Sequence, residues 1–161
     1  MNILEFAMNM ELEGEKYYTE QAEINKANSL SVIFLMLAKD ETMHFKVLEN
    51  RVNKLSYDLK QTETLAEAKN IFSNMGDLKN EIKQMPNQLD VYRAALENEK
   101  ASITLYQKYL SEATDDESKS LFEYLLKQEK GHYALIDQLV SIVSRPEEWV
   151  ESAEFGLRED Y

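Results

Sequence analysis

The clearest pattern in the chain is an apolar stripe with the three- to four-residue spacing of one face of an α-helix. It occurs once in each half. The first stripe comprises Phe34, Leu37, Glu41, His44, Leu48, Val52 and Leu55. The second comprises Phe122, Leu125, Glu129, His132, Leu135, Leu139 and Val143. In each stripe a glutamate and a histidine stand where apolar residues are expected, so these polar positions are the candidates for function.

Glycine and proline are scarce in the chain, with four and two copies, so long helices are expected. Asn28 and Ser29 are suitable helix N-caps. Thr114 and Glu117 have the spacing of a capping box, and Pro146 is expected to end the last helix. The sequence predicts four helices, at about residues 2–25, 29–55, 87–111 and 114–144.

The lengths of the connections predict the topology. Only a few residues separate the first helix from the second and the third from the fourth, so each pair forms an antiparallel hairpin. Residues 56–86 form one long crossover, with a short helix at about residues 65–75. We therefore predict one all-α domain, a four-helix bundle of two hairpins with a short C-terminal tail at residues 145–161. Trp149 and Phe155 are expected to anchor this tail on the bundle or on another subunit.

The two halves form an internal repeat with an offset of 88 residues. The offset relates eight pairs: Ala7 and Ala95, Glu11 and Glu99, Tyr18 and Tyr106, Phe34 and Phe122, Leu37 and Leu125, Lys39 and Lys127, Glu41 and Glu129, His44 and His132. Two hairpins related by a pseudo-twofold axis would bring these residues to one shared centre.

Composition narrows the function classes. The net charge of -12 gives no electrostatic reason to bind nucleic acid or an anionic membrane. Because the chain has no cysteine, disulfides and thiolate metal sites are excluded. We see no targeting segment, and the longest apolar run, residues 32–38, is too short to span a bilayer. A cytoplasmic location is the simplest expectation.

The two Glu-x-x-His motifs indicate a metal centre, because this spacing places both side chains on one helix face, one turn apart. One further glutamate from each of the other two helices completes the ligand set of ferritin-like di-metal carboxylate proteins. The predicted ligands are Glu11, Glu41, His44, Glu99, Glu129 and His132. Mixed oxygen and nitrogen ligands favour iron or manganese, although zinc can bind them. We expect two iron ions per chain, since chance placement would not explain the repeat.

Four further residues are predicted to lie near these ligands. Tyr18 and Tyr106 follow Glu11 and Glu99 by seven residues and should point inward, as hydrogen-bond donors beside the centre, as redox-active groups or as buried aromatics. We favour the hydrogen bond. Gly14 and the matching serine at position 102 leave room beside the metals or allow close helix packing, and both interpretations remain open.

These motifs resemble those of the rubrerythrin family. The resemblance covers the four helices and rests on the same pattern in each half. In the first half the pattern consists of Ala7, Glu11, Tyr18, Leu37, Ala38, Glu41 and His44. In the second it consists of Ala95, Glu99, Tyr106, Leu125, Glu129 and His132. Bacterioferritin has the same kind of six-residue ligand set.

The resemblance implies a di-iron centre that reacts with hydrogen peroxide or dioxygen in defence against oxidative stress. It implies that Glu11 and His44 bind one iron and that Glu99 and His132 bind the other. The remaining two ligands, Glu41 and Glu129, would bridge the two irons.

The chain departs from typical rubrerythrins in two respects. It has no cysteine and therefore no rubredoxin module, so electrons are expected from a separate donor protein. Ser102 occupies the place of an additional glutamate, which implies a more symmetric centre. We expect an oxidoreductase acting as a homodimer. The alternatives are an iron-binding ferroxidase or storage protein, which usually needs a cage of many subunits, and an adaptor with a relic metal site.

Overall fold

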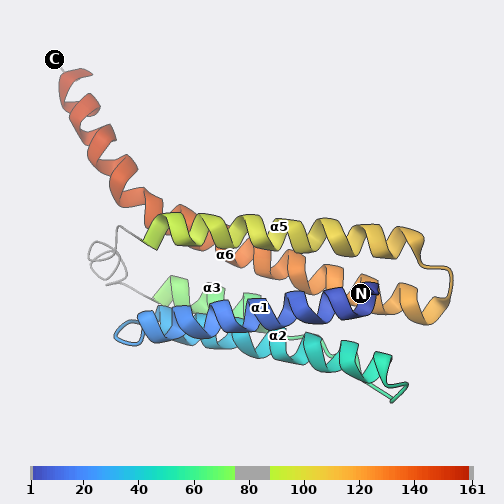
Figure 1. Ribbon diagram of the computed structural model, residues 1–161. Helices are drawn as coiled ribbons and strands as arrows, with labels where there is room; N and C mark the ends of the chain where they lie inside the picture. The colour runs from blue at the N-terminus through green and yellow to red at the C-terminus, as the bar shows by residue number, and fades with distance from the viewer. Residues whose placement is uncertain (1, 75–87, 160–161) are drawn as a thin grey trace.

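The computed structural model describes residues 2–74 and 88–159, and the side chains of residues 2–74 and 88–144. Every regular element in these ranges is a helix, as predicted (Figure 1). The helices are α1 (Ile3–Ile24), α2 (Leu30–Val52), α3 (Thr64–Asn74), α5 (Leu89–Glu112) and α6 (Asp116–Glu159). The fold class predicted from the apolar stripes, an all-α bundle, is therefore confirmed.

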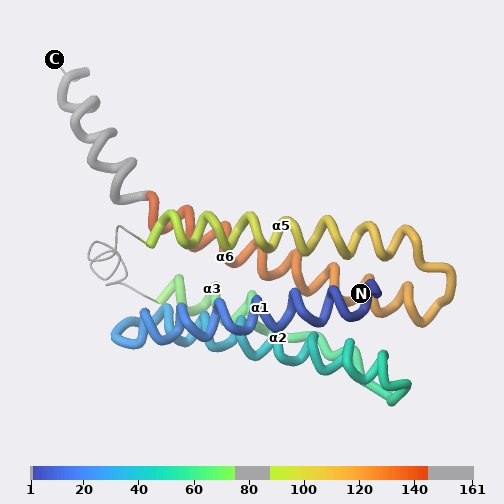
Figure 2. Tube along the Cα trace, viewed as in Figure 1, coloured from blue at the N-terminus to red at the C-terminus, as the bar shows by residue number. Residues whose placement is uncertain are grey.

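The four long helices form two hairpins that lie side by side (Figures 1 and 2). Helix α1 packs along α2, and α5 packs along α6. The described part of the crossover, up to Asn74, returns along the bundle, and its helix α3, predicted at about residues 65–75, packs against α2 and α6. This arrangement directs one face of each long helix toward a common interior.

The first hairpin begins with side-chain caps that satisfy free backbone amides. Asn2 Oδ1 accepts a hydrogen bond of 2.9 Å from the amide of Glu5 at the start of α1. Between the helices, Asn28 Oδ1 accepts one of 2.9 Å from the amide of Leu30. Of the two predicted caps for α2, Asn28 therefore provides the side-chain bond, whereas Ser29 makes no side-chain capping bond.

Helix α6 differs from its prediction at both ends. Its first turn is capped by Asp115, whose Oδ2 accepts from the amide of Ser118 at 2.9 Å, rather than by Thr114. A carboxylate at this position also interacts favourably with the helix dipole. The helix continues to Glu159, so the predicted end at Pro146 and the tail beginning at residue 145 are wrong. A proline removes one backbone hydrogen bond, which a long helix can tolerate with a kink.

The predicted anchoring role of Trp149 and Phe155 lies outside the described side chains, which end at residue 144. The same holds for the structure of residues 75–87, which complete the crossover.

The apolar core lies on both sides of a polar layer. One cluster contains Phe34 and Leu37, and the other contains Leu48 and Phe122. The stripe predicted on α2 is buried only as far as Leu48. Val52, the last residue of α2, is 37% exposed, and Leu55, beyond the end of the helix, is 59% exposed. The stripe predicted on α6 is buried throughout.

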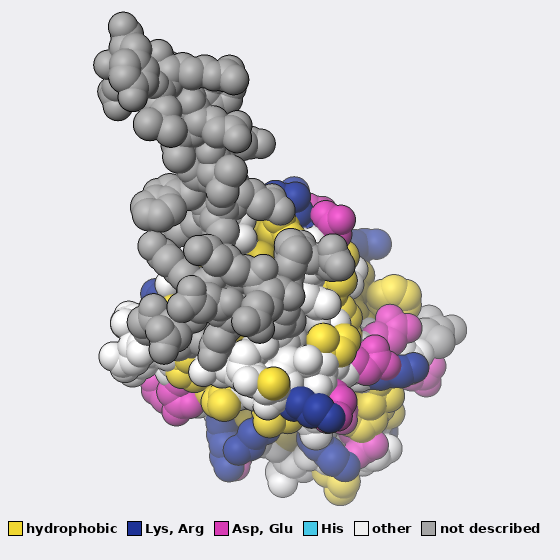
Figure 3. All heavy atoms as spheres, turned by 90° about the vertical axis from the view of Figure 1, so that its left-hand side faces the viewer, with side chains coloured by type: hydrophobic (Ala, Val, Ile, Leu, Met, Phe, Trp, Pro, Cys, Tyr) yellow, Lys and Arg dark blue, Asp and Glu magenta, His cyan; other side chains and the backbone are white. Residues whose placement is uncertain are grey.

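The outer surface mixes charged and apolar side chains. Figure 3 shows lysine, arginine, aspartate and glutamate side chains interspersed with apolar ones over one end of the bundle. In the part of the chain that the structure describes, no helix has the length and apolarity needed to cross a bilayer.

Candidate metal centre

All six predicted ligands lie in the bundle interior, between the two apolar clusters. Each of α1 and α5 contributes one glutamate, and each of α2 and α6 contributes one Glu-x-x-His pair. Their exposed fractions are 1% for Glu11, 4% for Glu41, 0% for His44, 5% for Glu99, 1% for Glu129 and 3% for His132. Side chains of this kind are rarely buried unless they are paired or hold a cation.

The six side chains form two overlapping groups of four. The first group is Glu11, Glu41, His44 and Glu129, and the second is Glu41, Glu99, Glu129 and His132. Within each group one possible ligand atom per residue lies within 4.8 Å of the others. Only Glu41 and Glu129 belong to both groups, so their carboxylates stand where bridging ligands would be needed.

Both imidazoles point Nδ1 toward the carboxylates. His44 Nδ1 lies 3.2 Å from Glu11 Oε2, and His132 Nδ1 lies 3.0 Å from Glu41 Oε1. The opposite nitrogen of each ring contacts an oxygen, because Nε2 of His44 is 3.0 Å from Gln128 Oε1 and Nε2 of His132 is 2.9 Å from Asp40 Oδ2. An oxygen acceptor keeps a proton on Nε2, so Nδ1 is the nitrogen of each ring that could bind a metal.

The two predicted tyrosines donate hydrogen bonds to glutamates of the opposite hairpin. The Tyr106 hydroxyl donates to Glu11 Oε1 at 2.7 Å, and the Tyr18 hydroxyl donates to Glu99 Oε1. Each tyrosine therefore makes a hydrogen bond to one of the candidate ligands. Each bond leaves the second oxygen of its glutamate for another partner.

Burial and mutual repulsion prevent the four carboxylates from ionising together. Burial, followed by repulsion from neighbouring glutamates, raises the pKa of Glu41 and of Glu129 well above the usual range. Burial alone would also raise the pKa of Glu11, but the charge of His44 and hydrogen bonds from Glu41, His44 and Tyr106 lower it to about 2. The pKa of Glu99 is lowered in the same way, against the effect of burial, by Glu129, His132 and Tyr18.

The surroundings of His132 favour its protonated form. Burial lowers its pKa, but hydrogen bonds to Asp40, Glu41 and Glu99 outweigh burial and raise the pKa well above its usual value. Without a cation, the raised pKa values of Glu41, Glu129 and His132 all favour the protonated forms of these groups. Divalent cations could take the place of these protons, since metal ligands must be deprotonated.

The residues fit a pair of metal ions in charge and in donor type. Four carboxylates match the charge of two divalent cations, and each group of four has one imidazole nitrogen among its possible ligand atoms. Glu99 Oε2 is buried and has no hydrogen-bond partner among the described residues, which is costly for a carboxylate oxygen. A cation in the second group would supply that partner.

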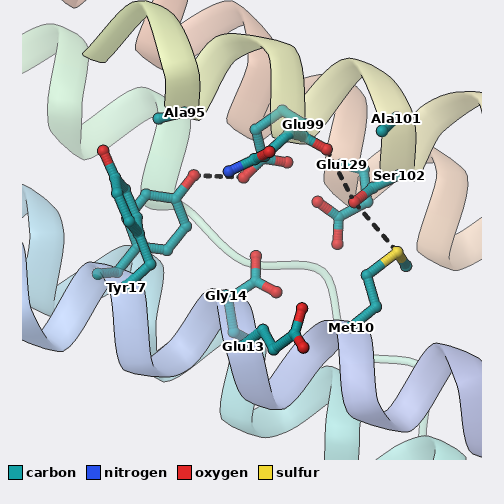
Figure 4. A pocket seen from close by; sticks show the side chains of 12 residues that line it. Met10, Glu13, Gly14, Tyr17, Ala95, Glu99, Ala101, Ser102 and Glu129 are labelled. Atoms are coloured by element: carbon teal, nitrogen blue, oxygen red, sulfur yellow. Dashed lines mark hydrogen bonds between the residues drawn. The ribbon is translucent and has the colours of Figure 1, made fainter. Parts of the chain in front are cut away.

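A cavity of about 200 Å³ reaches the centre between α1 and α5 (Figure 4). Its lining includes Gly14 and Ser102 as well as the glutamates at positions 41, 99 and 129. A Cβ at position 14 would lie 2.8 Å from Glu41 Oε2, so Gly14 makes room for a candidate ligand. At the matching position of α5, the Ser102 hydroxyl lies 3.2 Å from Asn98 O and 3.4 Å from Met10 Sδ and can donate its proton to either.

The sequence analysis missed three residues that surround the histidines: Asp40, Gln128 and Thr62. The hydroxyl of Thr62, in the crossover, lies 3.3 Å from both Asp40 Oδ2 and Gln128 Oε1. Asp40 and Gln128 are related by the 88-residue offset and each precedes a bridging candidate, so the repeat offered a signal for this pair. No repeat or motif marked Thr62.

Comparison with protein families finds one match, in which the model of the family described as Rubrerythrin covers residues 2–140. No curated protein and no solved structure matches the chain. The matched range contains all six candidate ligands and most of the four long helices. The chain therefore belongs to the rubrerythrin family, the family of the ferritin-like di-iron domain.

Proposed function

We propose that the chain binds two iron ions at the six-residue centre and reduces hydrogen peroxide or dioxygen with electrons from a separate donor protein. The observation that carries this proposal is the division of the ligands into two groups of four that share Glu41 and Glu129. Shared carboxylates hold two cations close enough to act on one small molecule.

The roles of the residues follow from their positions. Glu11 and His44 would hold one iron, Glu99 and His132 the other, and Glu41 and Glu129 both. Bound iron would supply the electrons for reduction and regain them from the donor. The buried carboxylates balance the cation charge, and the tyrosine hydrogen bonds keep Glu11 and Glu99 oriented.

The cavity fits a small, uncharged substrate. Its volume of about 200 Å³ is more than enough to admit peroxide or dioxygen, and three candidate ligands form part of its wall. The reaction balances when hydrogen peroxide accepts two electrons and two protons and leaves as two water molecules. Gly14 keeps the wall open on the α1 side, beside Glu41.

The test starts from metal-free protein loaded with ferrous iron without oxygen. We expect two irons per chain and rapid oxidation on mixing with peroxide, followed by near-ultraviolet absorbance. Oxidation faster with peroxide than with air supports the peroxidase reaction. Turnover with an added reductant supports an enzyme, whereas continued uptake of iron well beyond two per chain supports ferroxidase or storage activity.

Two variants control this experiment. His132→Ala removes a candidate ligand and should lower the iron count and the oxidation rate. Glu13→Gln changes an exposed carboxylate at the cavity and should leave the count at two. An iron count well below two in the unchanged protein, unaffected by His132→Ala, would contradict the di-iron proposal.

A further inference from the structure

The pseudo-twofold repeat breaks beside the histidines. Each imidazole is held through Nε2 by a side chain from the opposite hairpin, at matching positions 40 and 128. His132 contacts the carboxylate of Asp40, whereas His44 contacts the amide of Gln128. The two distances, 2.9 Å and 3.0 Å, are almost equal, so these two contacts differ in chemistry and not in length.

Both contacts are shielded from solvent. Asp40 is 4% exposed and Gln128 is 7% exposed. Solvent therefore screens the charge of Asp40 only weakly, and the charged and neutral acceptors interact differently with their imidazoles. Thr62 approaches both acceptors at 3.3 Å, but its hydroxyl has a single proton and can donate to only one of them at a time.

This difference acts on the ligand atom of each ring. A hydrogen bond from Nε2–H to a carboxylate is stronger than one to an amide. It also increases the basicity of the imidazole, so Nδ1 becomes a better metal ligand. Because Glu41 and Glu129 belong to both groups, differences in their surroundings do not by themselves favour either position.

We propose that the two metal positions are unequal, that the position at His132 binds a divalent cation first, and that Asp40 is the positioning residue that causes this order. The proposal rests on the two-metal centre of the proposed function. Outer hydrogen-bond partners of metal ligands typically change affinity about 10- to 100-fold, so we expect about a tenfold difference between the positions.

The chain offers a direct test because it has only two histidines. Protein labelled with ¹⁵N-histidine is freed of metal and titrated with Zn²⁺, and the ring nitrogens are followed by nuclear magnetic resonance. We expect Nδ1 of His132 to shift with the first equivalent of zinc and Nδ1 of His44 with the second. A His44→Gln variant assigns the signals.

Three variants identify the cause. Asp40→Asn replaces the carboxylate by an amide of the same shape and should weaken the first zinc step about tenfold, so that both imidazoles respond together. Gln128→Glu should strengthen binding at His44. Thr62→Val removes the hydroxyl near both acceptors and should preserve the order. Circular dichroism confirms that each variant is folded.

The outcomes separate this proposal from the proposed function. Two zinc ions with both imidazoles shifting in parallel, or with His44 first, would overturn the inequality and leave the two-metal centre intact. An unchanged order in folded Asp40→Asn and Gln128→Glu would overturn the role of Asp40. Absence of imidazole shifts with zinc would contradict the centre itself.

Discussion

In the α1–α2 hairpin, a glycine at position 14 leaves space for Glu41, and an aspartate precedes that glutamate. In the α5–α6 hairpin, the matching places hold Ser102 and Gln128. The ligands and their tyrosines are nevertheless repeated in full, with Tyr18 bonded to one half and Tyr106 to the other. The comparison separates the candidate ligands and their tyrosine partners, which both halves share, from neighbouring side chains that differ between the halves and would tune the surroundings of one metal position.

The largest effect should come from the glutamates that belong to both halves. Glu41→Gln and Glu129→Gln each remove a carboxylate from both groups of four, so we expect the loss of both metals and an affinity lowered by at least about 100-fold, beyond the usual effect of an outer partner. Metal counts after dialysis measure this. Glu11→Gln should weaken metal binding at the position of His44 more than at the position of His132. An equal loss at both positions would contradict the assignment of Glu11 to one metal.

The metal-free protein should lose stability as the pH rises above about 4.5. The folded state holds protons on Glu41 and Glu129 that the unfolded chain releases near their ordinary pKa of 4.5, so the free energy of unfolding falls with pH. The pKa of His132 is also raised in the fold, so its stabilisation is complete below 6.5 and is lost as the pH passes its folded pKa. Glu11 and Glu99 act in the opposite sense and add stability above 4.5.

Thermal unfolding between pH 5 and 8 checks this prediction. Each group that titrates changes the free energy of unfolding by about 1.4 kcal/mol per pH unit within its window. The metal-loaded protein should show less of this loss, because the metal replaces the protons. Parallel pH profiles with and without metal would show that the cations do not displace these protons.

Gly14→Ala and Ser102→Ala compare the two halves at matching positions. The added methyl group at position 14 would stand 2.8 Å from Glu41 Oε2 and displace a candidate ligand, so we expect metal affinity to fall about tenfold. Ser102→Ala removes only the hydroxyl contacts to Asn98 and Met10 and should change affinity little. Calorimetric titration measures both. Equal effects would indicate that the space beside Glu41 is unimportant.

The smallest difference between the halves should come from the tyrosines, where the halves match. Tyr18→Phe and Tyr106→Phe each remove one hydrogen bond to a buried glutamate, at about 1–3 kcal/mol in stability. Chemical denaturation of the metal-free variants checks this. Similar losses of stability in the two variants would support equal hydrogen bonds to Glu11 and Glu99. A large difference would show that the two halves also differ at these bonds.

The sequence predicted the helices and the inward direction of the candidate ligands, because helical periodicity and the repeat are local properties of the chain. It did not predict the end of α6, since the tolerance of a long helix for Pro146 depends on the whole helix. The exposure of Val52 and Leu55 depends on how far the neighbouring helices extend, which the stripe does not encode. Asp40 and Thr62 were missed for a related reason, because their partners lie on other elements.

The most direct test of the account is a crystal structure of iron-loaded protein with anomalous scattering measured at the iron edge. The account predicts two iron peaks in the bundle interior, one against Glu11 and His44 and the other against Glu99 and His132, with Glu41 and Glu129 between them. A fully loaded crystal with a single peak, or with iron only on the outer surface, would contradict it.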